Sequence, residues 1–128
     1  SPFGATLQDA IANRTNAMID AWTAARPGRP IVFFGPTWPS GAPNNRPPLT
    51  VYAVRDGIME AAWSRANENV WFIDRLIPAL REGIFSTPTD QASLYTNTDS
   101  THPTAMGHKF DGLWTAGALR RLILSEFA

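Results

Sequence analysis

Two side chains with acid–base chemistry lie three positions apart near the end of the chain. Asp99 and His102 belong to the sequence D-S-T-H-P, which ends at Pro103, and Gly107 follows. A histidine that acts as a general base presents one ring nitrogen to the nucleophile and needs an acceptor on the other, which a carboxylate supplies. An unperturbed imidazole titrates near pH 6.5, which suits a base at neutral pH. The spacing therefore predicts Asp99 and His102 as two members of a catalytic triad.

The spacing alone also has a simpler interpretation, in which the aspartate is a surface cap and the histidine begins a helix. A metal site is a third possibility, with Asp99, His102 and His108 as ligands. The two histidines are six residues apart, which is poor spacing for one helical face, and no metal or other cofactor is predicted. Pro103 sets φ for the first helical turn and favours the catalytic interpretation, as does the apolar strand earlier in the chain.

The third member of a triad is not evident, because no serine stands in a recognisable nucleophile motif. Ser100 lies between the acid and the base, where a turn role is the better interpretation, and Ser40 is a remote candidate. The chain also has no cysteine, which excludes a thiol nucleophile and disulfides. We therefore expect the nucleophilic serine and the oxyanion donors to come from a preceding segment or a partner chain.

The bulk composition is that of a globular domain. The 128 residues are 44% hydrophobic and 17% charged, and the formal net charge is zero. This composition excludes a disordered tail. Because no basic patch is visible, nucleic-acid binding is not expected. No apolar run approaches the roughly 18 residues that a membrane span needs.

Apolar periodicity predicts three helices, over residues 7–25, 50–66 and from about 103 almost to the end. Two short apolar runs, 31–34 and 70–73, predict strands that are buried on both faces. The alternation of helix and strand is typical of βαβ units and a parallel sheet in an α/β sandwich. We treat residues 1–128 as one domain.

The predicted inner faces of the helices follow from the spacing of their apolar residues. The inner face of the first helix is predicted to consist of Leu7, Ile11, Met18, Trp22 and Ala25, and that of the last helix of Met106, Phe110, Leu113, Trp114 and Gly117. Four tryptophans fall within predicted elements and are expected in the core: Trp22, Trp63, Trp71 and Trp114.

Two parallel strands cannot bury the apolar faces of three helices, because even isolated two-stranded pairs are marginal. We therefore expect further strands from a segment outside this chain, next to strand 31–34. The alternative is an overlooked strand within 84–96.

The loops that leave the two strands should meet at one edge of the sheet. Ligands of open parallel sheets bind at the carboxyl ends of the strands. A proline-rich loop with Pro36 and Trp38 leaves the first strand, and the loop after Asp74 leads to Asp99 and His102. Pro36 and Trp38 are therefore candidate substrate-binding residues at the same edge as the acid and the base.

The block from Asp99 to His108 resembles the last conserved block of the SGNH/GDSL hydrolases, which reads D-x-x-H-P with a glycine a few residues later. The stretch from Ile31 to Pro36 is similar to that family's fourth strand and the loop after it. The resemblance implies the C-terminal half of a five-stranded hydrolase fold, a three-layer α/β/α sandwich with a flavodoxin-like parallel sheet. It further implies Asp99 as the triad acid, His102 as the base, and Gly107 as a helix-packing residue.

The chain departs from the family pattern because it contains no G-D-S nucleophile motif, no oxyanion-hole glycine and no G-x-N-D block. The resemblance thus implies a serine esterase or lipase that is inactive as this chain alone. Its substrate would be a small ester or an acylated carbohydrate, and such hydrolases are frequently secreted. The alternatives are a non-catalytic carbohydrate- or protein-binding module on the same fold, and a structural subunit that pairs strands across chains.

Overall fold

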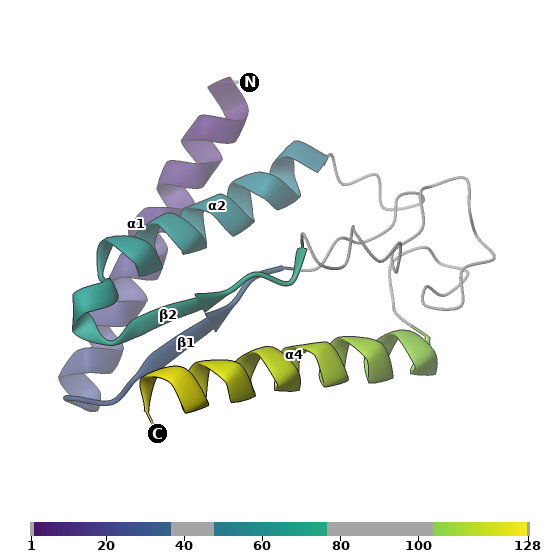
Figure 1. The fold of residues 1–128 in the computed structure, drawn as a ribbon. Helices are drawn as coiled ribbons and strands as arrows, with labels where there is room; N and C mark the ends of the chain where they lie inside the picture. Colours follow the sequence, from purple (N-terminus) through teal and green to yellow (C-terminus); the bar gives the residue numbers. More distant parts are fainter. Residues whose placement is uncertain (1, 37–47, 77–103, 128) are drawn as a thin grey trace. The chain divides into compact units, whose positions relative to one another are not determined.

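The computed structural model describes residues 2–36, 48–76 and 104–127, in which helices and a small parallel sheet follow one another (Figure 1). The chain divides into two compact units. The first contains the described residues 2–36 and 48–74, and the second contains the described residues 75–76 and 104–127. The predicted mixed α/β character is confirmed. The range 84–96, where a further strand was an alternative, lies outside the described residues.

Helix α1 spans Pro2–Ala25 and begins earlier than its predicted start at residue 7. A proline suits the first helical turn, where its missing N–H would have no partner. The helix ends just before Pro27 and Gly28, as predicted, and Gly28 has φ of 75°. This left-handed conformation is one that glycine adopts without steric cost.

The buried stripe of α1 consists of Ala12, Thr15 and Ile19, at spacings of three and four. The Thr15 hydroxyl donates to the Ile11 carbonyl oxygen at 2.8 Å, so this buried polar group is satisfied. The prediction of Met18 and Trp22 as core residues was wrong, because both are at least half exposed. The packed stripe passes through Ile19 instead, and every residue from 20 to 30 is exposed.

Helix α2 spans Pro48–Ser64 and packs along α1 on one side and against the sheet on the other. The two helices lie side by side in Figure 1. They approach closely at the buried Gly57, where an added Cβ would lie 2.6 Å from the Gln8 carbonyl oxygen. Trp63 was predicted in the core and is instead 64% exposed, so it does not lie on the faces of α2 that pack against α1 and the sheet.

Strands β1 (Ile31–Phe34) and β2 (Val70–Ile73) form a parallel pair, with Ile31 opposite Val70. Their bounds and their direction are those predicted. Ile31, Phe33 and Phe72 pack against a buried cluster. The cluster joins both helices to the sheet and comprises Ile19, Ala62 and Val70. Burial on both faces was wrong for β1, whose residues are half-buried or exposed: Ile31 and Phe33 pack against the buried cluster, whereas Phe34 is 40% exposed.

The turn before β2 is organised by Arg65, whose side chain is 17% exposed. Its Nε and Nη2 donate to the Glu68 carboxylate at 2.7 and 2.8 Å. Its Nη1 lies 2.7 Å from Asp20 Oδ1 and donates to the Asn16 carbonyl oxygen at 3.1 Å. Arg65 thus ties α1 to the short 3-10 helix η1 (Ala66–Glu68). The hydrogen bonds to Glu68 and Asp20 raise the pKa of Arg65, and the same bond from Arg65 lowers the pKa of Glu68.

Replacing Arg65 by methionine should lower the free energy of unfolding by about 1 kcal/mol, because a fork of charge-assisted hydrogen bonds is lost while the apolar stem is kept. Urea unfolding monitored by circular dichroism measures this change. The matched control is Arg14→Met, an exposed position on α1 with no ion pair among the described residues. Equal effects of the two substitutions would contradict a stabilising role for Arg65.

The pH dependence of the same bond has a definite sign. The pKa of Glu68 is lower in the folded chain than in the unfolded chain. The bond from Arg65 to Glu68 therefore contributes fully to the free energy of unfolding at pH values above the unfolded-state pKa of Glu68. This contribution is lost as the pH falls through the folded-state pKa of Glu68. The difference in stability between the native chain and Arg65→Met should therefore shrink in acid.

Helix α4 spans Ala105–Glu126 in the second unit, close to the predicted range. Its first turn contains the buried Gly107. The predicted inner face was wrong at Met106 and Leu113, which are 52% and 67% exposed, whereas Phe110, Trp114 and Gly117 are half-buried. Apolar residues occur around much of this helix, so periodicity alone could not select the buried ones.

Candidate functional site

The predicted acid, base and loop tryptophan, which are Asp99, His102 and Trp38, lie outside the described residues. Of the predicted site residues, the structure describes Pro36, which is half-buried and follows β1 by two residues. The structure describes the elements that flank these residues in the sequence, each within its own unit. They are the carboxyl ends of β1 and β2 and the start of α4.

At the carboxyl end of β1, Gly35 extends the ladder by one residue, since its N–H donates to the Ile73 carbonyl oxygen at 2.9 Å. An added Cβ at Gly35 would lie 2.9 Å from a ring carbon of Phe72. A glycine is thus required for the strand to run this close to the aromatic ring. Pro36 follows; in a parallel ladder a backbone N–H at this position would point away from β2, so the proline costs the β1–β2 ladder no hydrogen bond.

At the carboxyl end of β2, Asp74 is held by Arg55 of α2. Arg55 Nη2 and Nε donate to Asp74 Oδ2 at 2.9 and 3.2 Å, and Arg55 Nη1 donates to Asp56 at 2.5 Å. The side chains of the pair are 18% and 26% exposed. The hydrogen bond to Asp74 is the largest cause of a raised Arg55 pKa. The ion pair between Arg55 and Asp74 thus fastens the end of β2 to α2.

The start of α4 lies directly after the D-x-x-H-P block. Thr104 is the N-cap, and its Oγ1 accepts from the Gly107 N–H at 3.1 Å. The cap satisfies one of the four backbone donors that a helix start leaves without an intrahelical partner. His102 is therefore two residues before the N-cap. His108 is exposed on the first turn of the helix.

Within the second unit, α4 is attached to the segment that follows β2. Arg75 Nε donates to Asp111 Oδ1 at 3.2 Å, and Arg75 Nη2 pairs with Asp111 Oδ2. Two parallel hydrogen bonds of this kind fix orientation as well as distance. Arg75 therefore holds α4 against the segment that follows β2. Sequence reasoning missed this pair, because a single arginine and a single aspartate 36 residues apart form no recognisable pattern.

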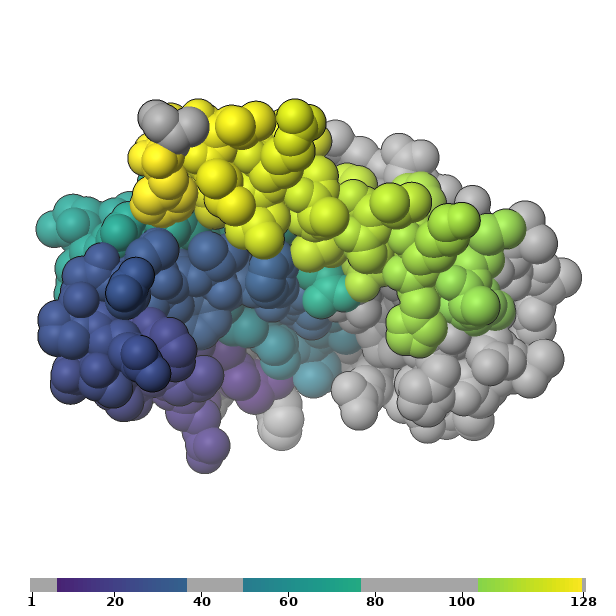
Figure 2. Space-filling model, turned by 90° about the horizontal axis from the view of Figure 1, so that it is seen from below, coloured from purple at the N-terminus to yellow at the C-terminus, as the bar shows by residue number. Residues whose placement is uncertain are grey.

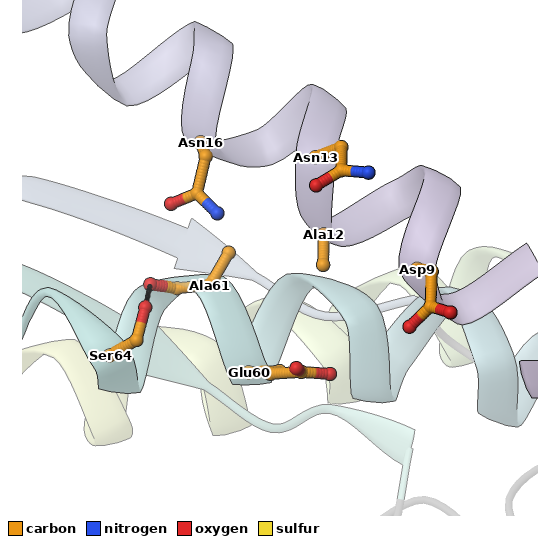
Figure 3. A pocket seen from close by; sticks show the side chains of 7 residues that line it. All are labelled: Asp9, Ala12, Asn13, Asn16, Glu60, Ala61 and Ser64. Carbon is orange, nitrogen blue, oxygen red and sulfur yellow. Dashed lines mark hydrogen bonds between the residues drawn. The ribbon is translucent and has the colours of Figure 1, made fainter.

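A polar groove of about 330 Å³ lies between α1 and α2 (Figure 3). Asp9, Asn13 and Asn16 line it from α1, and α2 contributes Glu60 and Ser64. Gln8 Nε2 donates to Glu60 at 3.0 Å, and the Ser64 hydroxyl donates to the Ala61 carbonyl oxygen at 2.8 Å. No histidine lines the groove, so Ser64 has no base there to activate it. The sequence held no signal for this groove, since scattered polar residues are ordinary on exposed helices.

Among residues 2–36, 48–76 and 104–127, no group of three or more histidine, cysteine, aspartate or glutamate residues is placed to hold a metal ion. In the same part of the chain, no helix has the length and apolarity to cross a membrane. No family model, curated protein or solved structure matches this chain.

Proposed function

We propose that this chain is the C-terminal part of an SGNH-type serine hydrolase domain that cleaves carboxylic esters. The proposed fold is a three-layer α/β/α sandwich with a flavodoxin-like parallel sheet. His102 is the general base and Asp99 orients it. The nucleophilic serine and the oxyanion donors are supplied by a preceding segment of the same hydrolase or by a partner chain.

The observation that carries the proposal is the position of the D-x-x-H-P block relative to α4. The block is followed at once by the N-cap Thr104 and by a helix whose Gly107 is buried. This agrees with the resemblance, in which the glycine after the block packs the helix. The capped helix start fixes the backbone that directly follows the block.

The parallel pair of β1 and β2 supports a larger sheet. In a parallel ladder the N–H and C=O of one residue point to the same neighbour, and successive residues alternate. Ile31 and Gly35 bond to β2, so the backbone groups of residues 32 and 34 point to the opposite edge of β1. Within the described residues no strand occupies that edge. The last strand of the segment that supplies the nucleophile fits there.

The proposed chemistry proceeds through an acyl-enzyme. The serine Oγ attacks the ester carbonyl as its proton passes to His102, and the oxyanion donors hold the negative oxygen. His102 then protonates the departing alcohol. A water molecule then attacks the acyl-enzyme, with His102 again taking the proton, and the carboxylic acid leaves as the serine is restored. Pro36 and Trp38, in the loop after β1, contact a substrate that is a small ester or an acylated carbohydrate of the extracellular space.

A fluorophosphonate probe tests where the nucleophile lies, because it phosphonylates an activated serine with loss of fluoride. We expect the adduct, mapped by mass spectrometry in the assembly that contains this chain, on a serine outside residues 1–128. The 128-residue chain alone should neither react nor hydrolyse p-nitrophenyl acetate. Ser40→Ala is the control and should not change the labelling.

Two outcomes would contradict the proposal in different ways. An adduct on a serine within residues 1–128 would refute the external nucleophile but keep the hydrolase. An assembly that neither reacts with the probe nor hydrolyses the ester would refute the hydrolase. It would then favour a non-catalytic binding module.

A further inference from the structure

The last turns of α1 leave the core and remain on the surface. The buried stripe that ends at Ile19 continues, three residues later, at Trp22, which is 50% exposed. Figure 2 shows the end of α1 and the start of β1, coloured blue, at the surface of the molecule. An indole ring at a core-facing position is thus left without cover. Large exposed aromatic side chains of this kind are common in protein interfaces.

A turn brings two arginines to this indole. The helix ends at Ala25, the Arg29 N–H donates to the Arg26 carbonyl oxygen at 3.3 Å, and Gly28 has φ of 75°. The turn borders an open surface groove of about 440 Å³. The α1-end groove is defined by its lining residues Trp22, Arg26, Arg29 and Pro30.

The two arginines of the groove have no ion pair with any described residue. Three other arginines, which are Arg55, Arg65 and Arg75, are all paired with carboxylates. Asp20, the acidic residue closest in sequence to the groove, is itself paired with Arg65. The groove therefore presents two positive charges beside an apolar ring. A ligand that carries a carboxylate next to an apolar group would complement this surface.

We propose that the α1-end groove binds an acidic peptide segment of another protein, independently of ester hydrolysis. Carboxylates of the segment pair with Arg26 and Arg29, whose planar guanidinium groups match carboxylate geometry. An apolar side chain of the segment covers Trp22. Tryptophan and arginine are the residues that most often contribute the largest share of binding energy in protein interfaces.

The observations favour a peptide over a membrane surface. Binding to anionic lipid typically requires a cluster of 4–8 basic residues, whereas the groove contains two. The net charge of zero gives no general attraction to polyanions.

The test is fluorescence anisotropy with a labelled peptide in which a phenylalanine is flanked on each side by two glutamates. We expect saturable binding that weakens with added salt, because exposed charge pairs are screened. The double variant Arg26→Glu/Arg29→Glu should weaken binding at least about tenfold, and Trp22→Ala should do so by a similar factor. Both changes lie outside the core, and circular dichroism confirms the fold of each variant.

Arg14→Glu is the matched control, since it makes a charge change at an exposed position earlier on α1, and it should leave the affinity within about twofold. A second peptide with glutamines in place of glutamates should not bind. Equal binding of the two peptides, or unchanged binding by the double variant, would overturn the proposal. So would binding to anionic phospholipid vesicles without binding to the acidic peptide.

Discussion

Replacing His102 by alanine should lower kcat for p-nitrophenyl acetate by about 10²–10⁴-fold, the contribution typical of a positioned general base. The measurement uses the complete hydrolase, with the segment that supplies the serine. Without the imidazole, the serine proton has no acceptor as the oxygen attacks, and the departing alcohol has no donor. KM should change much less than kcat, because the base acts in the transition state rather than in substrate binding.

Two further variants separate catalysis from structure. Asp99→Asn should also lower kcat strongly, because an amide can stabilise neither the required tautomer nor the imidazolium. His108→Ala is the matched control, since this second histidine is exposed on the first turn of α4, and it should leave kcat within about twofold. Full activity of His102→Ala would refute the assignment of the base.

Replacing Gly57 by alanine should lower the free energy of unfolding by about 2–3 kcal/mol, an overpacking cost. The new Cβ would lie 2.6 Å from the Gln8 carbonyl oxygen and 2.8 Å from Ile11 Cβ. Because the first of these is a backbone atom, α1 as a whole must move away from α2. The intrinsic preference of a helix for alanine over glycine, about 1 kcal/mol, offsets only part of this cost.

The control for Gly57 is the same substitution at Gly112 of α4, which is exposed and where an added Cβ meets nothing within 4 Å. Gly112→Ala should therefore raise the free energy of unfolding by up to about 1 kcal/mol. Urea unfolding monitored by circular dichroism measures both variants. If Gly57→Ala were as stable as Gly112→Ala, the close approach of α1 and α2 would be wrong.

Local signals predicted the elements well. The apolar, β-branched and aromatic runs at 31–34 and 70–73 are strands with these same bounds. The intervening helix is long enough to make the connection between them a parallel crossover, as the register shows. Pro27 and Gly28 marked the end of α1, and Pro103 with Thr104 marked the start of α4. Each of these signals acts within a few residues, so one sequence is enough to read it.

Burial was predicted less well. Trp22 and Trp63 fit apolar stripes and are nevertheless exposed. Periodicity shows which residues share a face, but it does not show how far along the helix a neighbour covers that face. The small residues Ala12, Ala61 and Ala62 are buried instead. Ala12 and Ala61 lie between α1 and α2, and Ala62 belongs to the cluster that joins the helices to the sheet.

The sequence by itself determined the order of the elements, the parallel direction of the strands and the candidate triad residues Asp99 and His102. It did so because these depend on short-range backbone preferences and on the chemistry of neighbouring side chains. Only the tertiary structure decided that Arg55 pairs with Asp74, that Arg65 ties α1 to the turn before β2, and that the end of α1 is left uncovered. The two ion pairs join side chains that are far apart in the sequence, and the exposure of the end of α1 depends on how far the neighbouring elements extend along it. Local backbone preferences determine neither of these.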